Sequence, residues 1–273
     1  MITYPNAKIN LGLYITEKRP DGYHSIETVF VPVPKLCDIL EIVPKSDQDE
    51  SISFTQSGLE IDDDRNSNLC IKAFNLINQK VKLPKVAIHL HKQIPLGAGL
   101  GGGSSNGAFA LKMLNQLAEK PLSQQELADS ALELGSDCPF FLHNMPCFAS
   151  GQGEKIEPLD LKLTGYHILL VNLGIHVNTG KAYACSNPQP APFNLRLVET
   201  TPIEKWKNLV SNDFEKIVFT QHPQVESIKH KLYSIGALYA SMSGSGSTVY
   251  GFFKNNPKVG ELFGKMFTHI SVL

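Results

Sequence analysis

The clearest pattern in the chain is an alternation of apolar and polar positions close to the N-terminus. Apolar side chains stand at every second position, at Ala7, Ile9, Leu11, Leu13 and Ile15. This alternation predicts a β-strand with one apolar face. Lys8 and Asn10 fall on the opposite face, so their side chains can share a site. A turn sequence at residues 19–22 leads into a second extended run, 23–33, which we expect to pair with the first strand.

The rest of the chain mixes strand-like and helix-like segments. Ser123 and Glu126 form a capping box in front of apolar residues at helical spacing, which continue to Gly135. Further strands are expected at residues 38–44, 86–91 and 167–172, and a helix at 68–80. Such irregular alternation predicts an α+β fold. We expect two domains, 1–160 and 161–273.

Residues 95–107 read Pro-Leu-Gly-Ala-Gly-Leu-Gly-Gly-Gly-Ser-Ser-Asn-Gly, and an amphipathic helical run follows them. Five glycines between Pro95 and Ser105 remove the Cβ atoms that would keep a ligand from the backbone. They also allow positive-φ conformations, which turn successive N–H groups toward one point in front of a helix N-terminus. The segment therefore predicts a phosphate-binding loop.

Other interpretations of these glycines fit less well. A Walker A loop ends in Gly-Lys-Ser or Gly-Lys-Thr, whereas these glycines run into Ser104 and Ser105. Gly97, Gly99 and Gly102 have the spacing of a dinucleotide-binding loop, but the capping box predicts a helix where that fold requires its second strand. A flexible Gly/Ser linker seldom separates a strand-like run from a strongly periodic helix.

Composition narrows the class of protein further. A formal net charge of −1 over 273 residues gives no long-range attraction for nucleic acid or an anionic membrane. Five cysteines without metal-ligand spacing favour thiols in a reducing compartment, and no segment has the character of a signal peptide or membrane span. We therefore expect a cytoplasmic protein, a monomer or weak homodimer, with neither nucleic acid nor membrane as partner.

Three segments carry a family resemblance: Asn-Ala-Lys-Ile-Asn-Leu at residues 6–11, the glycine loop at 95–105, and Met-Ser-Gly-Ser-Gly at 242–246. They resemble the three motifs of the GHMP kinase superfamily, named for galactose, homoserine, mevalonate and phosphomevalonate kinases. The resemblance implies a two-domain α+β fold, with an N-terminal ribosomal-protein-S5-like nucleotide-binding domain and a C-terminal ferredoxin-like α/β sandwich. Residues 19–24 and 134–139 are similar to members whose small-molecule substrate carries a cytidine diphosphate group.

The resemblance implies an ATP-dependent kinase of the non-mevalonate isoprenoid route that phosphorylates a hydroxyl of a sugar alcohol. Asn68 begins a segment similar to the family's adenine pocket, although an Asn before a helix also serves as its cap. Mg²⁺ should accompany ATP and be held by phosphates, water and a loop hydroxyl, because no cluster of carboxylates is evident. The residues implied to bind the ATP phosphates are Pro95, Leu96, Gly97, Ala98, Gly99, Leu100, Gly101, Gly102, Gly103, Ser104 and Ser105.

Two residues are implied to be catalytic. Asp137 matches the family's catalytic aspartate, which accepts the proton of the attacking hydroxyl, and Lys8 neutralises charge near that carboxylate. The residues alone allow a structural role as well. Asp137 could be the N-cap of a short helix with Pro139 in its first turn.

The substrate-binding residues are implied in the same way. Tyr23 and His24 match residues that hold the cytosine, and Tyr183 matches an aromatic residue that closes the other side. Asn10 is expected either to bind the hydroxyls of the sugar alcohol or to orient Lys8. The remaining members of this set are Thr179, Gly244 and Ser245. The chain departs from the family at residues 172–174, where Asn-Leu-Gly replaces the common Pro-Gly.

Three alternatives stay open at this point. Another GHMP kinase, acting on homoserine or mevalonate, is disfavoured by Asp-Gly-Tyr-His at residues 21–24. A dinucleotide-dependent oxidoreductase depends on the glycine spacing alone. A non-catalytic RNA-binding module would follow from the ribosomal-protein-like N-terminal half, but the near-zero net charge disfavours it.

Overall fold

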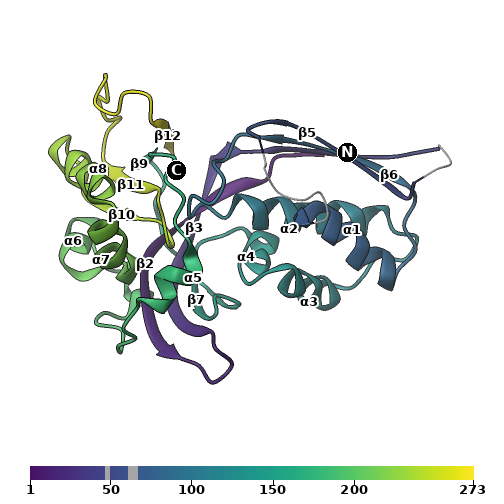
Figure 1. Ribbon diagram of the computed structural model, residues 1–273, viewed down its shortest axis with the longest axis horizontal. Helices are drawn as coiled ribbons and strands as arrows, with labels where there is room; N and C mark the ends of the chain where they lie inside the picture. The colour runs from purple at the N-terminus through teal and green to yellow at the C-terminus, as the bar shows by residue number, and fades with distance from the viewer. Residues whose placement is uncertain (47–49, 61–66) are drawn as a thin grey trace. The chain divides into compact units, whose positions relative to one another are not determined.

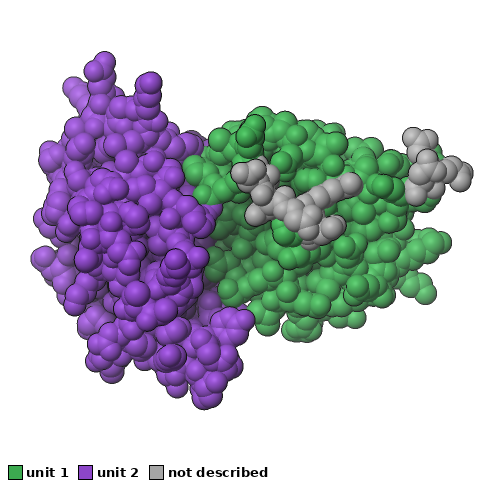
Figure 2. Space-filling model, in the orientation of Figure 1, with its two compact units in different colours: residues 1–7, 36–96, 101–144 green, residues 8–35, 97–100, 145–273 purple. Residues whose placement is uncertain are grey.

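The computed structural model describes residues 1–46, 50–60 and 67–273. These residues form two compact units, each assembled from separate stretches of the chain (Figure 2). Unit 1 comprises residues 1–7, 36–96 and 101–144, and unit 2 comprises residues 8–35, 97–100 and 145–273. The chain thus passes from unit 2 into unit 1 within the glycine loop. The division into domains 1–160 and 161–273 stays a prediction, because compactness alone does not test it.

Unit 1 combines a sheet with helices on one of its faces (Figure 1). The strand order is β1-β4-β6-β5, in which β6 is antiparallel to β4 and parallel to β5. Every second side chain of β6 is buried, as expected for a strand with one covered face. The elements are β1 (Ile2–Thr3), β4 (Ile39–Pro44), β5 (Ile52–Gly58), β6 (Val86–Lys92), α1 (Leu69–Lys80), α2 (Gly102–Leu117), α3 (Gln124–Leu134) and α4 (Cys138–His143).

Unit 2 contains most of one sheet with the order β2-β3-β7-β8 and a second sheet with the order β10-β11-β9-β12. The strands are β2 (Asn6–Lys18), β3 (His24–Cys37), β7 (Cys147–Gly151), β8 (Lys155–Pro158), β9 (His167–Asn172), β10 (Tyr239–Met242), β11 (Val249–Phe253) and β12 (Phe267–Val272). The helices are α5 (Thr179–Ala184), η2 (Leu195–Glu199), α6 (Ile203–Leu209), α7 (Asp213–Gln221) and α8 (Pro223–Ser234). In the described part of the chain, no helix is both long and apolar enough to span a membrane.

The second sheet of unit 2 has the strand order of a ferredoxin-like sandwich. Strand β9 lies between β11 and β12, and all its pairings are antiparallel. Helices α6, α7 and α8 lie along one side of this sheet (Figure 1). Side chains of β9, such as Leu169 and Val171, share one apolar core with Phe214 of α7 and Leu232 of α8. Helices packed on largely antiparallel sheets confirm the α+β prediction.

The strongest sequence patterns correspond to observed elements. The alternation over residues 7–15 becomes β2, which pairs with β3 as predicted. The capping box is present, because the Ser123 hydroxyl accepts the N–H of Glu126 and the Glu126 carboxylate accepts the N–H of Ser123. Strand β5 was not predicted, since its side chains are largely exposed and no apolar alternation marks it.

A buried ion pair lies beneath the start of α2 in unit 1. Lys92 Nζ and Asp38 Oδ2 are 2.5 Å apart, and their side chains are only 1% and 0% exposed. The Asp38 carboxylate also accepts hydrogen bonds from the amide of Asn106 in α2 and from the N–H groups of Gln93 and Ile94. Because buried charges are tolerated when their hydrogen bonds are satisfied, this network can fix the beginning of the helix that follows the glycine loop.

We expect Lys92→Met to lower the free energy of unfolding by about 3–5 kcal/mol, because it leaves the Asp38 carboxylate buried without its cation. Denaturant unfolding monitored by circular dichroism measures this loss. Lys82→Met is the matched control, since the pair of Lys82 with Glu119 is 80% and 69% exposed, and its removal should cost about 0–1 kcal/mol. Equal losses in the two variants would contradict this account of the buried pair.

Candidate active site

The three sequence motifs meet in unit 2 at the hydroxyl of Ser243. Ser243 Oγ donates to the carbonyl of Gly99 at 2.6 Å and accepts the N–H of Asn10 at 3.1 Å. Two backbone hydrogen bonds strengthen this junction: Lys8 N–H donates to Leu100 O, and Thr248 N–H donates to Ala98 O. The start of β2, the first half of the glycine loop and the loop 243–248 therefore form one hydrogen-bonded cluster.

Lys8 and Asn10 share a site, as the strand period predicted. Lys8 Nζ donates to Asn10 Oδ1 at 2.6 Å, and both residues are buried. The ammonium group also lies 4.6 Å from the centre of the Phe30 ring. Asn10 Nδ2 donates to the hydroxyl of Thr28 at 3.0 Å, which fixes the amide. Asn10 thus orients Lys8, one of its two expected roles, whereas its binding of substrate stays a prediction.

Three glycines of the loop adopt the backbone conformations that the sequence predicted. Gly97, Gly99 and Gly101 have φ values of 58°, 76° and 67°. A Cβ atom on Gly99 would overlap the carbonyl oxygen of Ser243, so glycine is required by the close approach of two backbones. Residues 97–100 thus owe their shape to neighbours within unit 2.

The second half of the glycine loop, in unit 1, leaves space for a ligand. Gly101 precedes α2 and provides no side-chain cap, and a Cβ atom on Gly103 would meet no protein atom within 4 Å. Ser105 Oγ is buried without a hydrogen-bond partner among the described residues. An open helix N-terminus with an unused buried hydroxyl fits the phosphates of a nucleotide.

Asp137 stands directly before α4 in unit 1. It occupies the cap position and Pro139 lies in the first turn, but the Asp137 carboxylate makes no capping hydrogen bond. Asp137 thus has the position that the structural alternative gave it, but without the side-chain hydrogen bond of a cap. The neighbouring Cys138 thiol is buried, which raises its pKa to about 12, and it forms a hydrogen bond with Ser104. This contact places the residue after Asp137 beside the first turn of α2.

The predicted substrate residues of unit 2 form two contacting pairs. The rings of His24 and Tyr183 are stacked, with centroids 5.0 Å apart and an angle of 17° between their planes. Thr179 Oγ1 and Ser245 Oγ lie 2.8 Å apart. Tyr23 stands next to His24 with its side chain 61% exposed, so its ring is accessible to a ligand.

Two further predicted residues have clear local roles. Gly244 has a φ of 56°, and a Cβ atom there would lie 3.3 Å from Asn10 Oδ1, so glycine suits this approach to β2. Asn68 caps α1, since its side-chain oxygen accepts the N–H of Cys70 at 2.9 Å. The cap interpretation of Asn68 is confirmed, and its contact with adenine stays a prediction.

Asn172 has a role that the sequence analysis missed. Its side-chain oxygen accepts the N–H of Gly174 at 2.7 Å, which closes the turn after β9. Its amide nitrogen donates to Thr248 Oγ1 at 3.0 Å, at the end of the loop 243–248. The Asn-Leu-Gly sequence thus forms a turn that is closed by the Asn side chain.

In the parts of the chain that the structure describes, no group of three or more His, Cys, Asp or Glu side chains is arranged to hold a metal ion. The five cysteines, all described, are thiols rather than disulfides.

Family models of the GHMP kinases match a segment in each half of the chain. The family model for the GHMP kinases N terminal domain matches residues 68–145, and the model for GHMP kinases C terminal matches residues 196–269. The 4-diphosphocytidyl-2-C-methyl-D-erythritol kinase of Bacteroides fragilis is 50% identical over 259 residues, 95% of this chain and 94% of that protein. The kinase of the same name from Cytophaga hutchinsonii is 46% identical and covers 94% of each chain.

Solved structures agree with these relatives. A crystal structure of 4-(cytidine 5'-diphospho)-2C-methyl-D-erythritol kinase aligns with a TM-score of 0.84 and 28% identity, over 99% of this chain and 98% of that chain. Homoserine kinase from Cytophaga hutchinsonii aligns with a TM-score of 0.66 over 98% of this chain and 93% of that chain. At 14% identity, the second match shows the fold alone.

We expect alanine substitutions at Gly99 and Gly103 to change thermal stability in opposite directions. Gly99→Ala forces a Cβ atom into the Ser243 carbonyl at a positive φ, which should cost about 1–3 kcal/mol. Gly103→Ala adds a helix-favouring residue in open space and should gain up to about 1 kcal/mol. Thermal unfolding without nucleotide compares the two. A large loss of stability in Gly103→Ala would contradict the open space above that residue.

Proposed function

The chain belongs to the family of 4-diphosphocytidyl-2-C-methyl-D-erythritol kinases, within the GHMP kinases, and on this basis we propose that it phosphorylates the 2-hydroxyl of 4-diphosphocytidyl-2-C-methyl-D-erythritol with ATP. The products are the 2-phosphate and ADP, a step of the non-mevalonate route to isoprenoid precursors. The main structural support is the junction at Ser243, where three motifs resembling those of the family meet.

The proposed reaction requires a base and local positive charge. Asp137 accepts the proton of the 2-hydroxyl as its oxygen bonds to the γ-phosphorus of ATP, and the bond between that phosphorus and the bridging oxygen of ADP breaks. Lys8 stabilises the negative charge that is shared by the entering oxygen and the phosphoryl group. The buried hydrogen bond from Lys8 to Asn10 supports this role, because it fixes the direction of the ammonium group.

The second half of the glycine loop suits the ATP phosphates. The open approach at Gly103 and the unused hydroxyl of Ser105 support this assignment. When bound, Mg²⁺ neutralises phosphate charge. We assign its ligands to the phosphates, to water and to the Ser105 hydroxyl, which is the kind of oxygen ligand that this ion prefers.

The acceptor substrate is assigned to unit 2. Its cytosine stacks on the exposed ring of Tyr23, and His24 and Tyr183 complete an aromatic cluster around the base. Thr179, Gly244 and Ser245 contact the rest of the substrate. We place the reaction in the cytoplasm, a reducing compartment in which cysteines remain thiols, and expect a monomer or weak homodimer.

Magnesium-dependent release of ADP by the purified protein tests the activity. We expect turnover of 4-diphosphocytidyl-2-C-methyl-D-erythritol and none of homoserine, mevalonate or the sugar phosphate without the cytidine group. Turnover of homoserine or mevalonate instead would keep the kinase fold but overturn the assignment of Tyr23 and His24. A wild-type protein that turns over none of the four would refute the proposed function.

We expect Asp137→Asn to lower kcat by about 10²–10⁴-fold, because the amide cannot accept the proton of the substrate hydroxyl. The same ADP assay measures this loss at saturating ATP. Asp129→Asn is the matched control, since Asp129 is an exposed residue of α3 whose carboxylate accepts a hydrogen bond from Gln125. A wild-type kcat in Asp137→Asn would remove Asp137 from the chemical step.

Tyr23→Ala should raise KM for the cytidyl substrate by about 5- to 150-fold, the factor that corresponds to 1–3 kcal/mol for one stacked base. The kcat should change little, because the ring is assigned to binding alone. Tyr4→Ala provides a control of equal exposure, since both tyrosines are 61% exposed. If the two variants have the same KM, cytosine does not stack on Tyr23.

A further inference from the structure

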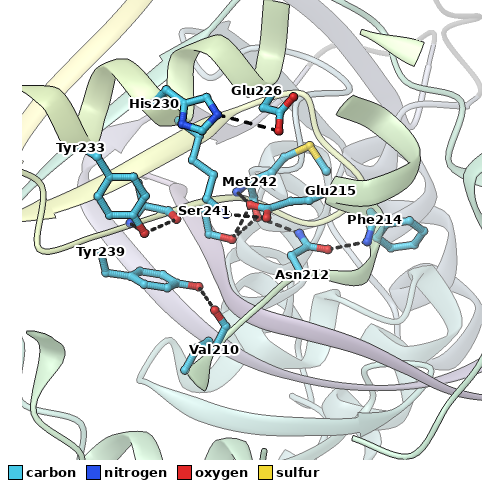
Figure 3. Close-up of polar contacts among 12 residues, drawn as sticks. Val210, Asn212, Phe214, Glu215, Glu226, His230, Tyr233, Tyr239, Ser241 and Met242 are labelled. Carbon is cyan, nitrogen blue, oxygen red and sulfur yellow. Dashed lines mark hydrogen bonds and ion pairs between the residues drawn. The ribbon is translucent and has the colours of Figure 1, made fainter. Parts of the chain in front are cut away.

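The first turn of α7 is attached to the residues around Ser243 (Figure 3). Asn212, the cap residue of α7, is buried, and its Nδ2 donates two hydrogen bonds. The acceptors are Met242 O at 2.8 Å and Gly244 O at 2.9 Å. These two carbonyls lie on either side of Ser243. One amide group therefore holds the backbone before and after the residue whose hydroxyl joins the three motifs.

Glu215, one turn further along α7, binds the same segment through other groups, namely the N–H of Met242 and the hydroxyl of Ser241. Its Oε1 accepts the N–H of Met242 at 2.8 Å and the hydroxyl of Ser241 at 2.9 Å. Its Oε2 lies 2.5 Å from Nζ of Lys229 in α8, which fixes the carboxylate in turn. Figure 3 shows the side chains of Asn212 and Glu215 converging on Ser241 and Met242.

Capping of the helix does not explain the amide of Asn212. The cap is made by Asn212 Oδ1, which accepts the N–H of Phe214 at 2.9 Å. Aspartate and serine provide the same acceptor and cap helices about as well as asparagine. The two hydrogen bonds from Nδ2 are what only the amide supplies, and both go to the segment 242–244.

We propose that Asn212 and Glu215 are positioning residues for phosphoryl transfer, which hold residues 241–244 so that Ser243 remains bonded to Gly99 and Asn10. They act through the loop 243–248 and do not touch the reacting atoms. The inference depends on the proposed function in one respect: it takes Gly244 and Ser245 to contact the substrate.

Asn212→Asp separates the two roles of Asn212. The variant retains the shape and the cap acceptor, but it turns a carboxylate oxygen toward two carbonyls in place of the donor. We expect faster hydrogen exchange in a peptide covering residues 243–248, and kcat/KM for the cytidyl substrate lower by about tenfold or more, the factor for one lost hydrogen bond of about 1.4 kcal/mol.

Asn194→Asp is the matched control. Asn194 caps η2 in unit 2 through the N–H of Arg196, and no hydrogen bond of its side chain reaches the loop in the described residues. This variant should keep wild-type exchange at residues 243–248 and wild-type kcat/KM. If Asn212→Asp fails to fold, Asn212→Ser takes its place, because serine caps the helix but cannot reach both carbonyls as an amide does.

Glu215 is tested by rescue. Glu215→Ala removes the acceptor for Met242 and should increase hydrogen exchange at residues 243–248 and lower kcat/KM. Glu215→Gln keeps an oxygen acceptor in the same place, so it should recover most of both losses even though its charge pair with Lys229 is gone. Equal losses in Glu215→Ala and Glu215→Gln would assign Glu215 to the ion pair and overturn its positioning role.

The two measurements separate failure of this inference from failure of the proposed function. Wild-type exchange and wild-type kcat/KM in Asn212→Asp would overturn the inference. Faster exchange with unchanged kcat/KM would overturn it too, because the loop would then not need to be held for catalysis. Absence of wild-type turnover would refute the proposed function, and with it the catalytic part of the inference, whereas the exchange data would still decide whether Asn212 holds the loop.

Discussion

The hydroxyl of Ser243 is the contact on which the candidate site of unit 2 depends. A serine hydroxyl has one hydrogen to donate, and here it goes to Gly99, while a lone pair accepts the N–H of Asn10. Both contacts bring the backbone of Ser243 close to the backbones of Gly99 and Asn10. The need for glycine at position 99 follows from this approach.

The glycine loop is supported separately at its two ends. Residues 97–100 are held within unit 2 by hydrogen bonds to β2 and to the loop 243–248. Residues 101–105 begin α2 in unit 1, and the buried pair of Lys92 and Asp38 stabilises that helix through Asn106. The first half forms hydrogen bonds with neighbouring segments of unit 2. In the second half, a Cβ atom on Gly103 would meet no protein atom within 4 Å. This difference supports the proposal that the second half of the loop binds the ATP phosphates.

The sequence predicted those features that depend on short-range patterns. A period of two placed Lys8 and Asn10 together, and a capping box marked the start of α3. Contacts between distant segments leave no such local signal. Thr28, Asn172 and Asn212 are single polar residues, and each has its role only because a partner far along the chain meets it. The missing side-chain cap at Asp137 shows the same limit, since a cap sequence does not fix the backbone: Asp137 has a helical φ of −83° and ψ of −15° instead of the extended conformation usual for a cap residue.

Each unit is assembled from stretches that alternate along the chain, and this arrangement sets the order in which the units can fold during synthesis. A chain grows from its N-terminus at about 5–20 residues per second. All residues of unit 1 have been made once residue 144 is added, but unit 2 still lacks β7 and β8 of its first sheet and all four strands of its second sheet. The remaining strands of the sheet that contains β2 and β3 are therefore made only after roughly ten seconds. Asn10 is made 233 residues before its partner Ser243, so its final surroundings are complete only long after β2 has been made.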